Sequence, residues 1–111
     1  TLKVRLLLKN GVLTARLHGE LDHHSAACVR DTIDDTAQKM RPHTLRLDFS
    51  EITFMDSSGI GLILGRLKLV SVWGGKVIVT NVAPELQKMI ELAGIPRLVE
   101  VRKEADGNEA V

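Results

Sequence analysis

The sequence predicts an α/β fold in which helices pack against a mixed sheet of four to five strands that begins with an N-terminal β-hairpin. The hairpin is indicated by Asn10-Gly11, a dipeptide that favours the tight turn between antiparallel strands, with a strand-like segment on each side. From residue 43 onward, short apolar segments alternate with segments of helical period. Strands that are joined through helices run parallel, so the sheet is expected to contain both orientations.

The size and composition of the chain exclude several classes of function. It has 111 residues and a mass of 12.2 kDa, which is the size of one domain. Its 15 basic and 14 acidic residues leave a net charge of +1, which argues against nucleic-acid binding through a broad basic surface. The single cysteine, Cys28, excludes an internal disulfide and a thiolate-based structural zinc site, and is expected in or near the core. No segment has the length of a membrane span, so we expect a cytoplasmic protein without membrane contact.

The first part of the chain is expected to form two strands and a helix. Residues 2–8 and 12–18 have strand character on either side of the Asn10-Gly11 turn. From about residue 23 to residue 40 the apolar residues follow a helical period, and one face is formed by Val29, Ile33, Ala37 and Met40. Asp22 is expected to cap this helix, and Arg41-Pro42 ends it.

The rest of the chain alternates strands with helices. The expected elements are a strand at 45–49 continued by 52–55, a second helix from Asp56 to about Val72, a strand at 76–80, a third helix from Pro84 to Gly94 and an edge strand at 98–101. Trp73-Gly74-Gly75 ends the second helix, and proline is well suited to the first turn of the third. Residues 1–102 are therefore expected to form one domain, and residues 103–111 a flexible C-terminal tail.

The second helix contains an unusual number of glycines. Its natural core stripe is formed by Ile60, Ile63, Leu67 and Val70, but Gly59, Gly61 and Gly65 lie in the same helix. Each glycine destabilises a helix by about 1 kcal/mol relative to alanine. Two explanations stay open at this point. Either the glycines pack closely on a strand beneath them, or Gly61 and Gly65 allow the backbone of another protein to approach an outer face.

Asp56-Ser57-Ser58 stands at the start of the same helix. These residue types cap helices, because their side chains accept hydrogen bonds from the free amides of the first turn. Two adjacent hydroxyls at a helix N-terminus are also a favourable place for a phosphate group, whose charge the free amides and the helix dipole stabilise. A phosphoserine here would be tolerated by the fold and would change the surface charge.

Metal binding and catalysis find little support in the remaining motifs. Gly19-Glu20-Leu21-Asp22-His23-His24 contains possible ligands, but adjacent histidines on a helix diverge by about 100° and do not face one ion. The segment after Asp56 is neither a Gly-x-Ser-x-Gly nucleophile elbow nor a phosphate-binding loop. We therefore expect no metal, no cofactor and no active site of the chain's own.

Three segments together resemble the anti-sigma factor antagonists, which carry the STAS domain. They are Gly19-Glu20-Leu21-Asp22-His23-His24, then Phe54-Met55-Asp56-Ser57-Ser58-Gly59-Ile60-Gly61, and then Ile63-Leu64-Gly65-Arg66. The resemblance is to the members that act in sporulation, and it extends from the first strand to about Val101. Asp-Ser-Ser-Gly alone would be a weak signal, but the combination is specific. The resemblance implies a STAS fold.

The resemblance also implies a site and a regulatory role. The first serine of Asp-Ser-Ser-Gly is the family's phosphoacceptor, which corresponds to Ser57. The partner is an anti-sigma factor that is itself an ATP-dependent serine kinase, and a separate phosphatase restores the serine. The unphosphorylated antagonist binds the anti-sigma factor and releases the sigma factor, and it is expected to be a monomer when free. The residues expected to contact the partner are Asp22, His23, Asp56, Ser58, Gly59, Gly61, Leu62, Gly65 and Leu69.

Two other functions remain open from the sequence. A STAS domain can serve as a scaffold in another signalling pathway. It can also be a nucleotide-binding regulatory module, although the chain lacks a loop that would cradle phosphates. Direct DNA recognition is not expected, because the net charge is only +1.

Overall fold

The computed structural model describes residues 1–104. The elements are β1 (Leu2–Lys9), β2 (Val12–Leu21), α1 (Ala26–Met40), β3 (Thr44–Met55), α2 (Ser57–Ser71), β4 (Lys76–Thr80), α3 (Pro84–Leu92), a short 3-10 helix (Ile95–Arg97) and β5 (Glu100–Arg102). Every strand and helix expected from the sequence is present, although β2 and β3 are longer than expected.

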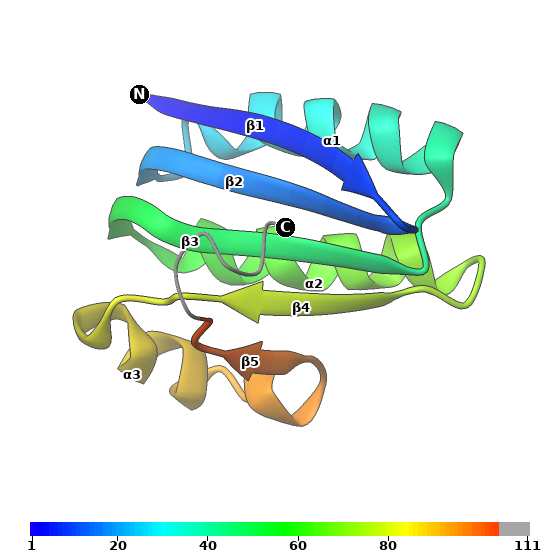
Figure 1. Ribbon diagram of the computed structural model, residues 1–111. Coiled ribbons are helices and arrows are strands. Elements are labelled where there is room, and N and C mark those ends of the chain that lie inside the picture. The colour runs from blue at the N-terminus through cyan, green and yellow to red at the C-terminus, as the bar shows by residue number, and fades with distance from the viewer. Residues whose placement is uncertain (105–111) are drawn as a thin grey trace.

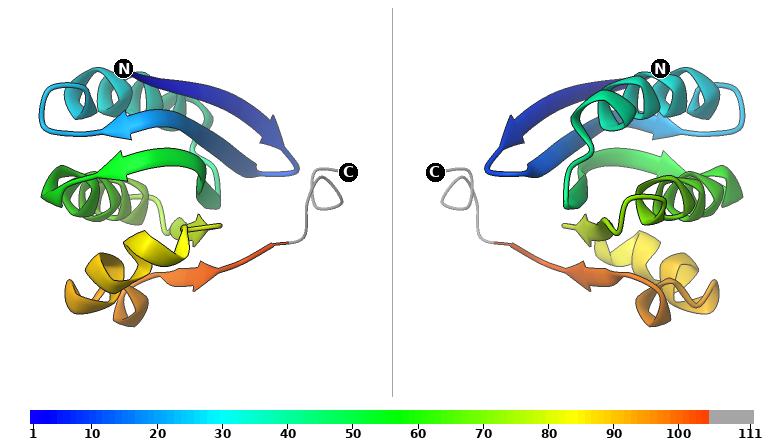
Figure 2. Two further views of the ribbon diagram at one scale, coloured as in Figure 1. Left: turned by 90° about the vertical axis from the view of Figure 1, so that its left-hand side faces the viewer. Right: turned by 90° about the vertical axis from the view of Figure 1, so that its right-hand side faces the viewer.

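The strands form one mixed sheet in the order β1-β2-β3-β4-β5. β1 pairs with β2 in antiparallel orientation, and the other three pairings are parallel. All three α-helices lie on one side of this sheet, and within residues 1–104 no helix covers its other face, which we call the open face (Figures 1 and 2). The predicted fold class is confirmed, with five strands.

The hairpin turn has the geometry that its sequence predicts. Asn10 and Gly11 both have positive φ angles, of 54° and 79°, as a type I′ turn requires. The turn sets the register, because Lys9 then pairs with Val12 and the ladder continues to Leu2 opposite Gly19. At the far end Gly19 has a φ of +116°, and a Cβ there would lie 1.9 Å from the carbonyl oxygen of Thr1, so this position requires glycine.

The core lies between the sheet and the three helices. Alternate residues of β2 and β3 point into it, and Leu13, Leu17, Leu47 and Phe49 are completely buried. Ile33 of α1 is buried against them in the same cluster. This alternation is the reason that the opposite face of the sheet carries mostly polar and charged residues.

Helix α1 begins later than the sequence predicted. Its first residue is Ala26 and its N-cap is Ser25, so Asp22 is not the cap. Cys28 is exposed rather than in or near the core, because it lies off the face that buries Val29. Met40 is also exposed, since it is the last residue of the helix.

Helix α2 is rotated relative to the predicted core stripe. Ile63 and Val70 are buried as expected, but Ile60 and Leu67 are only half-buried. Gly59 and Leu62, which were expected to contact a partner, are buried instead. The buried stripe is centred one position earlier than predicted and includes Arg66, whose charge the sequence pattern had placed outside the core and which pairs with an acidic residue of α1.

Arg66 forms a buried ion pair with Asp34. The guanidinium Nε lies 2.7 Å from Oδ1 of Asp34, and Nη2 donates to Oδ2 at 3.2 Å. A third nitrogen, Nη1, donates to the carbonyl of Leu62. Burial raises the pKa of Asp34 and lowers the pKa of Arg66, so the loss of water opposes both charges. The pair therefore joins α2 to α1 across their buried interface.

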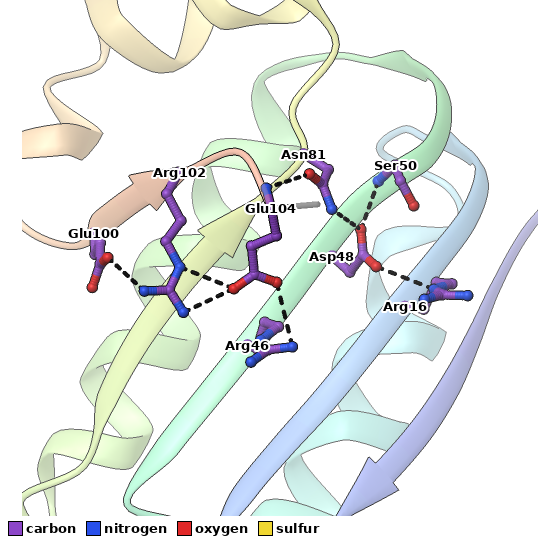
Figure 3. A network of polar contacts seen from close by, with 8 residues as sticks. All are labelled: Arg16, Arg46, Asp48, Ser50, Asn81, Glu100, Arg102 and Glu104. Atoms are coloured by element: carbon purple, nitrogen blue, oxygen red, sulfur yellow. Dashed lines mark hydrogen bonds and ion pairs between the residues drawn. The ribbon is translucent and has the colours of Figure 1, made fainter. Parts of the chain in front are cut away.

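Residue 104 is held against the open face of the sheet (Figure 3). The Glu104 carboxylate lies 3.4 Å from Arg46 and 2.8 Å from Arg102, and the Glu104 amide donates to Asn81. Lys103 and Glu104 are the described residues of the predicted tail, and residues 105–111 lie outside the described part of the chain.

Candidate functional site

The candidate site lies where β2 and β3 end. These strands run parallel, and their last residues, Leu21 and Met55, are paired. An aspartate follows directly after each strand, Asp22 after β2 and Asp56 after β3. The amide of Asp56 donates to the carbonyl of Leu21 at 3.2 Å. The carboxyl ends of parallel strands meet at one edge of a sheet, so two motifs far apart in sequence become neighbours.

Asp56 connects the two loops at this edge. It is the N-cap of α2, and its Oδ1 accepts hydrogen bonds from the Ser58 amide at 2.8 Å and from the Ser58 hydroxyl. Its Oδ2 accepts from the His23 amide at 3.3 Å. The Ser58 hydroxyl, followed by the Ser58 amide, lowers the pKa of Asp56 below its usual value. The carboxylate is therefore charged at neutral pH.

Asp22 organises the β2–α1 loop. Its Oδ1 accepts from the amides of His24 and Ser25 at 3.0 and 2.9 Å and from the Ser25 hydroxyl at 2.8 Å. These bonds, above all the one from the Ser25 hydroxyl, lower the pKa of Asp22. Asp22 in turn raises the pKa of Asp56 slightly by charge repulsion, so the two carboxylates already influence each other.

The two serines of the motif differ in their surroundings. Ser57 is exposed at the first position of α2, and within residues 1–104 its hydroxyl has no hydrogen-bond partner. The Ser58 hydroxyl is half-buried and donates to Asp56. A modifying enzyme would therefore meet the Ser57 hydroxyl first, whereas modification of Ser58 would break the N-cap.

The structure separates the two explanations left open for the glycines. A Cβ on Gly59 would lie 2.4 Å from the sulfur of Met55 and 3.2 Å from a methyl carbon of Leu21, so Gly59 serves internal packing. A Cβ on Gly61 or Gly65 would meet nothing within 4 Å. The fold therefore has no packing requirement for these two glycines, which leave helix backbone bare on an outer surface.

We call this surface the α2 outer face; it consists of Ser57, Gly61, Leu64, Gly65 and Lys68. Ser57, Gly61 and Lys68 are exposed, and the other two are half-exposed. Leu69, which was expected in the surface, is half-buried on its flank, and His23 is exposed at its Asp56 end. Within the described chain, Lys68 is the only charged residue of the outer face.

Phe54 is a candidate contact residue that the sequence analysis did not assign. Its side chain is 49% exposed, although it stands between the buried residues Ile52 and Met55 in β3. Such an aromatic ring near a polar site is typical of interface anchors. Register shifts between β2 and β3 place Phe54 opposite Glu20, on a surface beside Asp56. The signal was present in the sequence as the aromatic residue directly before Met55-Asp56-Ser57.

Chemically, the site is suited to modification and binding. It presents one free hydroxyl, two carboxylates with lowered pKa and a length of bare helix backbone.

His23 and His24 lie edge to face with their ring centres 6.0 Å apart. Among residues 1–104, no three histidine, cysteine or acidic side chains are grouped as a metal site would require. The helices in the same range are all too short or too polar to cross a membrane.

Comparisons with known proteins agree with this description. Residues 3–107 match the STAS domain family. An anti-sigma F factor antagonist of Paenibacillus polymyxa is 36% identical over 100 residues, which cover 90% of this chain and 86% of that protein. The structure of the anti-sigma factor antagonist SpoIIAA in its unphosphorylated form superposes with a TM-score of 0.83 at 28% identity, covering 97% of this chain and 93% of the other. The Bacillus SpoIIAA structure in the phosphorylated form superposes with a TM-score of 0.74, also at 28% identity, and covers 97% and 96% of the two chains.

Proposed function

The chain belongs to the STAS domain family, and from this premise we propose that it is an anti-sigma factor antagonist switched off by phosphorylation of Ser57. Unphosphorylated, it binds an anti-sigma factor that is also a serine kinase, and thereby releases a sigma factor. A phosphatase reverses the modification. The chain acts as a binding protein and not as an enzyme, in the cytoplasm, where transcription takes place.

The observation that carries this proposal is the free hydroxyl of Ser57 next to bare backbone. Ser57 and Gly61 lie one turn apart on the α2 outer face, where the fold itself needs neither a free hydroxyl nor a glycine. Both features fit one purpose: a kinase that docks on the helix reaches the serine at its N-terminus. The names of the relatives support the same role.

The switch follows from charge. Without phosphate, the outer face can be buried at a low cost in desolvation because Lys68 is its only charged residue. A phosphate on Ser57 adds about −1.5 to −2 charges. That charge would lie near the carboxylates of Asp22 and Asp56, and burying it against a partner is opposed by desolvation and by repulsion. The free amides at the start of α2 stabilise the phosphate, so the helix itself stays intact.

The proposal is tested by phosphorylation in vitro. The protein and its Ser57→Ala variant are incubated with an anti-sigma serine kinase and Mg-ATP, and the intact masses are measured. We expect the parent to gain one phosphate and the variant none. A gain in both proteins would move the modified residue to Ser58 or elsewhere. No gain in either, with a kinase proven active on another antagonist, would favour a STAS scaffold with a different partner.

Alanine at Gly61 and Gly65 should stabilise the fold and weaken binding. Each substitution removes the helix penalty of glycine, so the free energy of unfolding should rise by about 1 kcal/mol per site in urea denaturation. The added methyl groups would hold the partner away from the helix, and we expect the affinity for the kinase to fall at least about tenfold, which is about 1.4 kcal/mol.

Gly59→Ala is the matched control for this pair of variants. It should lower stability, because its Cβ would meet Met55 and Leu21 inside the core. Unchanged kinase binding by the Gly61→Ala/Gly65→Ala protein would contradict the assignment of the α2 outer face as the docking surface.

A further inference from the structure

We propose that the open face of the β1–β2 hairpin carries a second binding site, for a compact oligophosphate group. A hollow of about 470 Å³ lies on this face, lined by Lys3, Val4, Arg5, Arg16, His18 and Glu51. We call it the basic hollow. It is built from β1, β2 and the middle of β3, and none of its residues belongs to the Ser57 site. This inference goes beyond the proposed function and does not depend on it.

The register of the hairpin places two arginines opposite each other. Arg5 lies directly opposite Arg16, and Lys3 lies directly opposite His18. The like charges of Arg5 and Arg16 in this position destabilise an antiparallel pair. The two pairs are two residues apart along each strand, so all four side chains point to the same face of the sheet. Arg16 neutralises the nearly buried Asp48, but in residues 1–104 Arg5 and Lys3 have no such role in the fold, which points to a ligand for their charges.

The counter-charges on this face leave the cations incompletely neutralised. Arg16 uses only its Nε in the contact with Asp48, at 3.1 Å, and the two Nη groups have no partner within residues 1–104 (Figure 3). In the same part of the chain, Lys3 and Arg5 form neither an ion pair nor a side-chain hydrogen bond. The one carboxylate that lines the hollow is that of Glu51.

Irregular pairing between β2 and β3 shapes the hollow. Arg16 pairs with Asp48, whereas His18, two residues further along β2, pairs with Glu51, three residues further along β3. The register of the two strands therefore shifts between Arg16 and His18. Such a bulge bends the strand and redirects its side chains. Here it places Glu51 beside His18 at one end of the hollow and keeps Asp48 on Arg16 at the other. The remaining polar lining of the hollow is supplied by Lys3, Arg5 and Arg16.

The chemistry of these groups selects the ligand. Two guanidinium groups and one ammonium group are donors without acceptor capacity, and arginine matches phosphate oxygens in a bidentate geometry. Opposite side chains start about 5 Å apart across the hairpin and about 7 Å apart along a strand, a spacing that suits two or three linked phosphates. The lining residues include no phenylalanine, tyrosine or tryptophan, so His18 is the one ring among them that a nucleobase could stack on. The ligand is therefore recognised by its phosphate chain.

Calorimetric titration with sodium triphosphate at low salt tests this inference, using the whole chain without any partner. We expect binding that weakens as salt is raised, with the largest amide shifts in NMR spectra at residues 3–5 and 16–18. Lys3→Gln/Arg5→Gln should weaken binding by about thirtyfold or more, since each cation donates charge-assisted hydrogen bonds. The variant without ligand should melt no lower than the parent, because a like-charge repulsion has been removed.

Three controls make the result decisive. Lys39→Gln/Lys88→Gln removes the same charge at exposed positions of α1 and α3, and should bind triphosphate as the parent does. Citrate should bind at least tenfold more weakly than triphosphate, and ATP no more tightly than triphosphate. The inference is overturned if triphosphate does not bind at millimolar concentration, if Lys3→Gln/Arg5→Gln binds it as the parent does, or if citrate binds equally well. Much tighter binding of ATP would also overturn it, because the nucleoside would then be recognised.

Discussion

Phosphorylated on Ser57, the protein should bind the anti-sigma kinase at least about a hundredfold more weakly than the unmodified protein, a loss of about 2.7 kcal/mol. The reason is local. The phosphate brings about two negative charges to the proposed interface, close to Asp22 and Asp56, whose pKa values are lowered by their hydrogen bonds. These carboxylates remain charged well below neutral pH, so the repulsion is present throughout the physiological range.

The dissociation constants of both forms can be measured by calorimetry between pH 7.5 and pH 5.5. The second pKa of a phosphoserine is about 6, so the phosphate loses most of one charge over this range. The aspartates do not titrate there, because their pKa values lie below the usual 3.8. The difference in affinity between the two forms should therefore shrink as the pH falls, while the unmodified protein, whose Ser57 does not titrate, supplies the reference.

Ser57→Ala is the control for the phosphate itself. Since it removes only a free hydroxyl, it should bind the kinase about as tightly as the unmodified protein. Backbone NMR shifts of α2 in the phosphorylated protein should change only near the helix start. A melted or displaced α2 would show that the phosphate acts by rearranging the fold, and this electrostatic account would then be wrong.

Asp34→Ala should lower the free energy of unfolding by about 3 kcal/mol, whereas Arg66→Met should lower it far less. The alanine variant leaves the guanidinium of Arg66 buried at 5% exposure without its counter-charge. The methionine variant removes the buried charge and keeps an apolar side chain of similar length, and it leaves Asp34 partly in contact with water, at 24% side-chain exposure. Urea denaturation at pH 7 measures both.

The double variant Asp34→Ala/Arg66→Met distinguishes the attraction within the ion pair from the cost of leaving one buried charge without its partner. It should recover most of the stability lost in Asp34→Ala, because no uncompensated charge remains in the interface between α1 and α2. Equal losses in the two single variants would contradict this explanation, and would mean that the ion pair itself contributes strongly to stability.

The sequence by itself determined the features that depend on a few neighbouring residues. Asn10-Gly11 specified the hairpin turn and its register, Pro84 the start of α3, and Asp56 the cap of α2. Turn and cap preferences are local, so they are readable before any tertiary contact is known. The same holds for the motifs that revealed the family, because a phosphoacceptor and its flanking residues are contiguous in the chain.

Only the tertiary structure decided which faces meet and which side chains remain free. Helix α2 packs with Arg66 against Asp34 and with Leu62 buried, and the bare backbone of Gly61 and Gly65 lies on its outer side. Asp22 and Asp56 become neighbours because β2 and β3 end at the same edge. The basic hollow exists only once the hairpin has paired two arginines, a lysine and a histidine on one face. Each of these features depends on contacts between residues distant in sequence, and the energies of such contacts are not encoded in any local pattern.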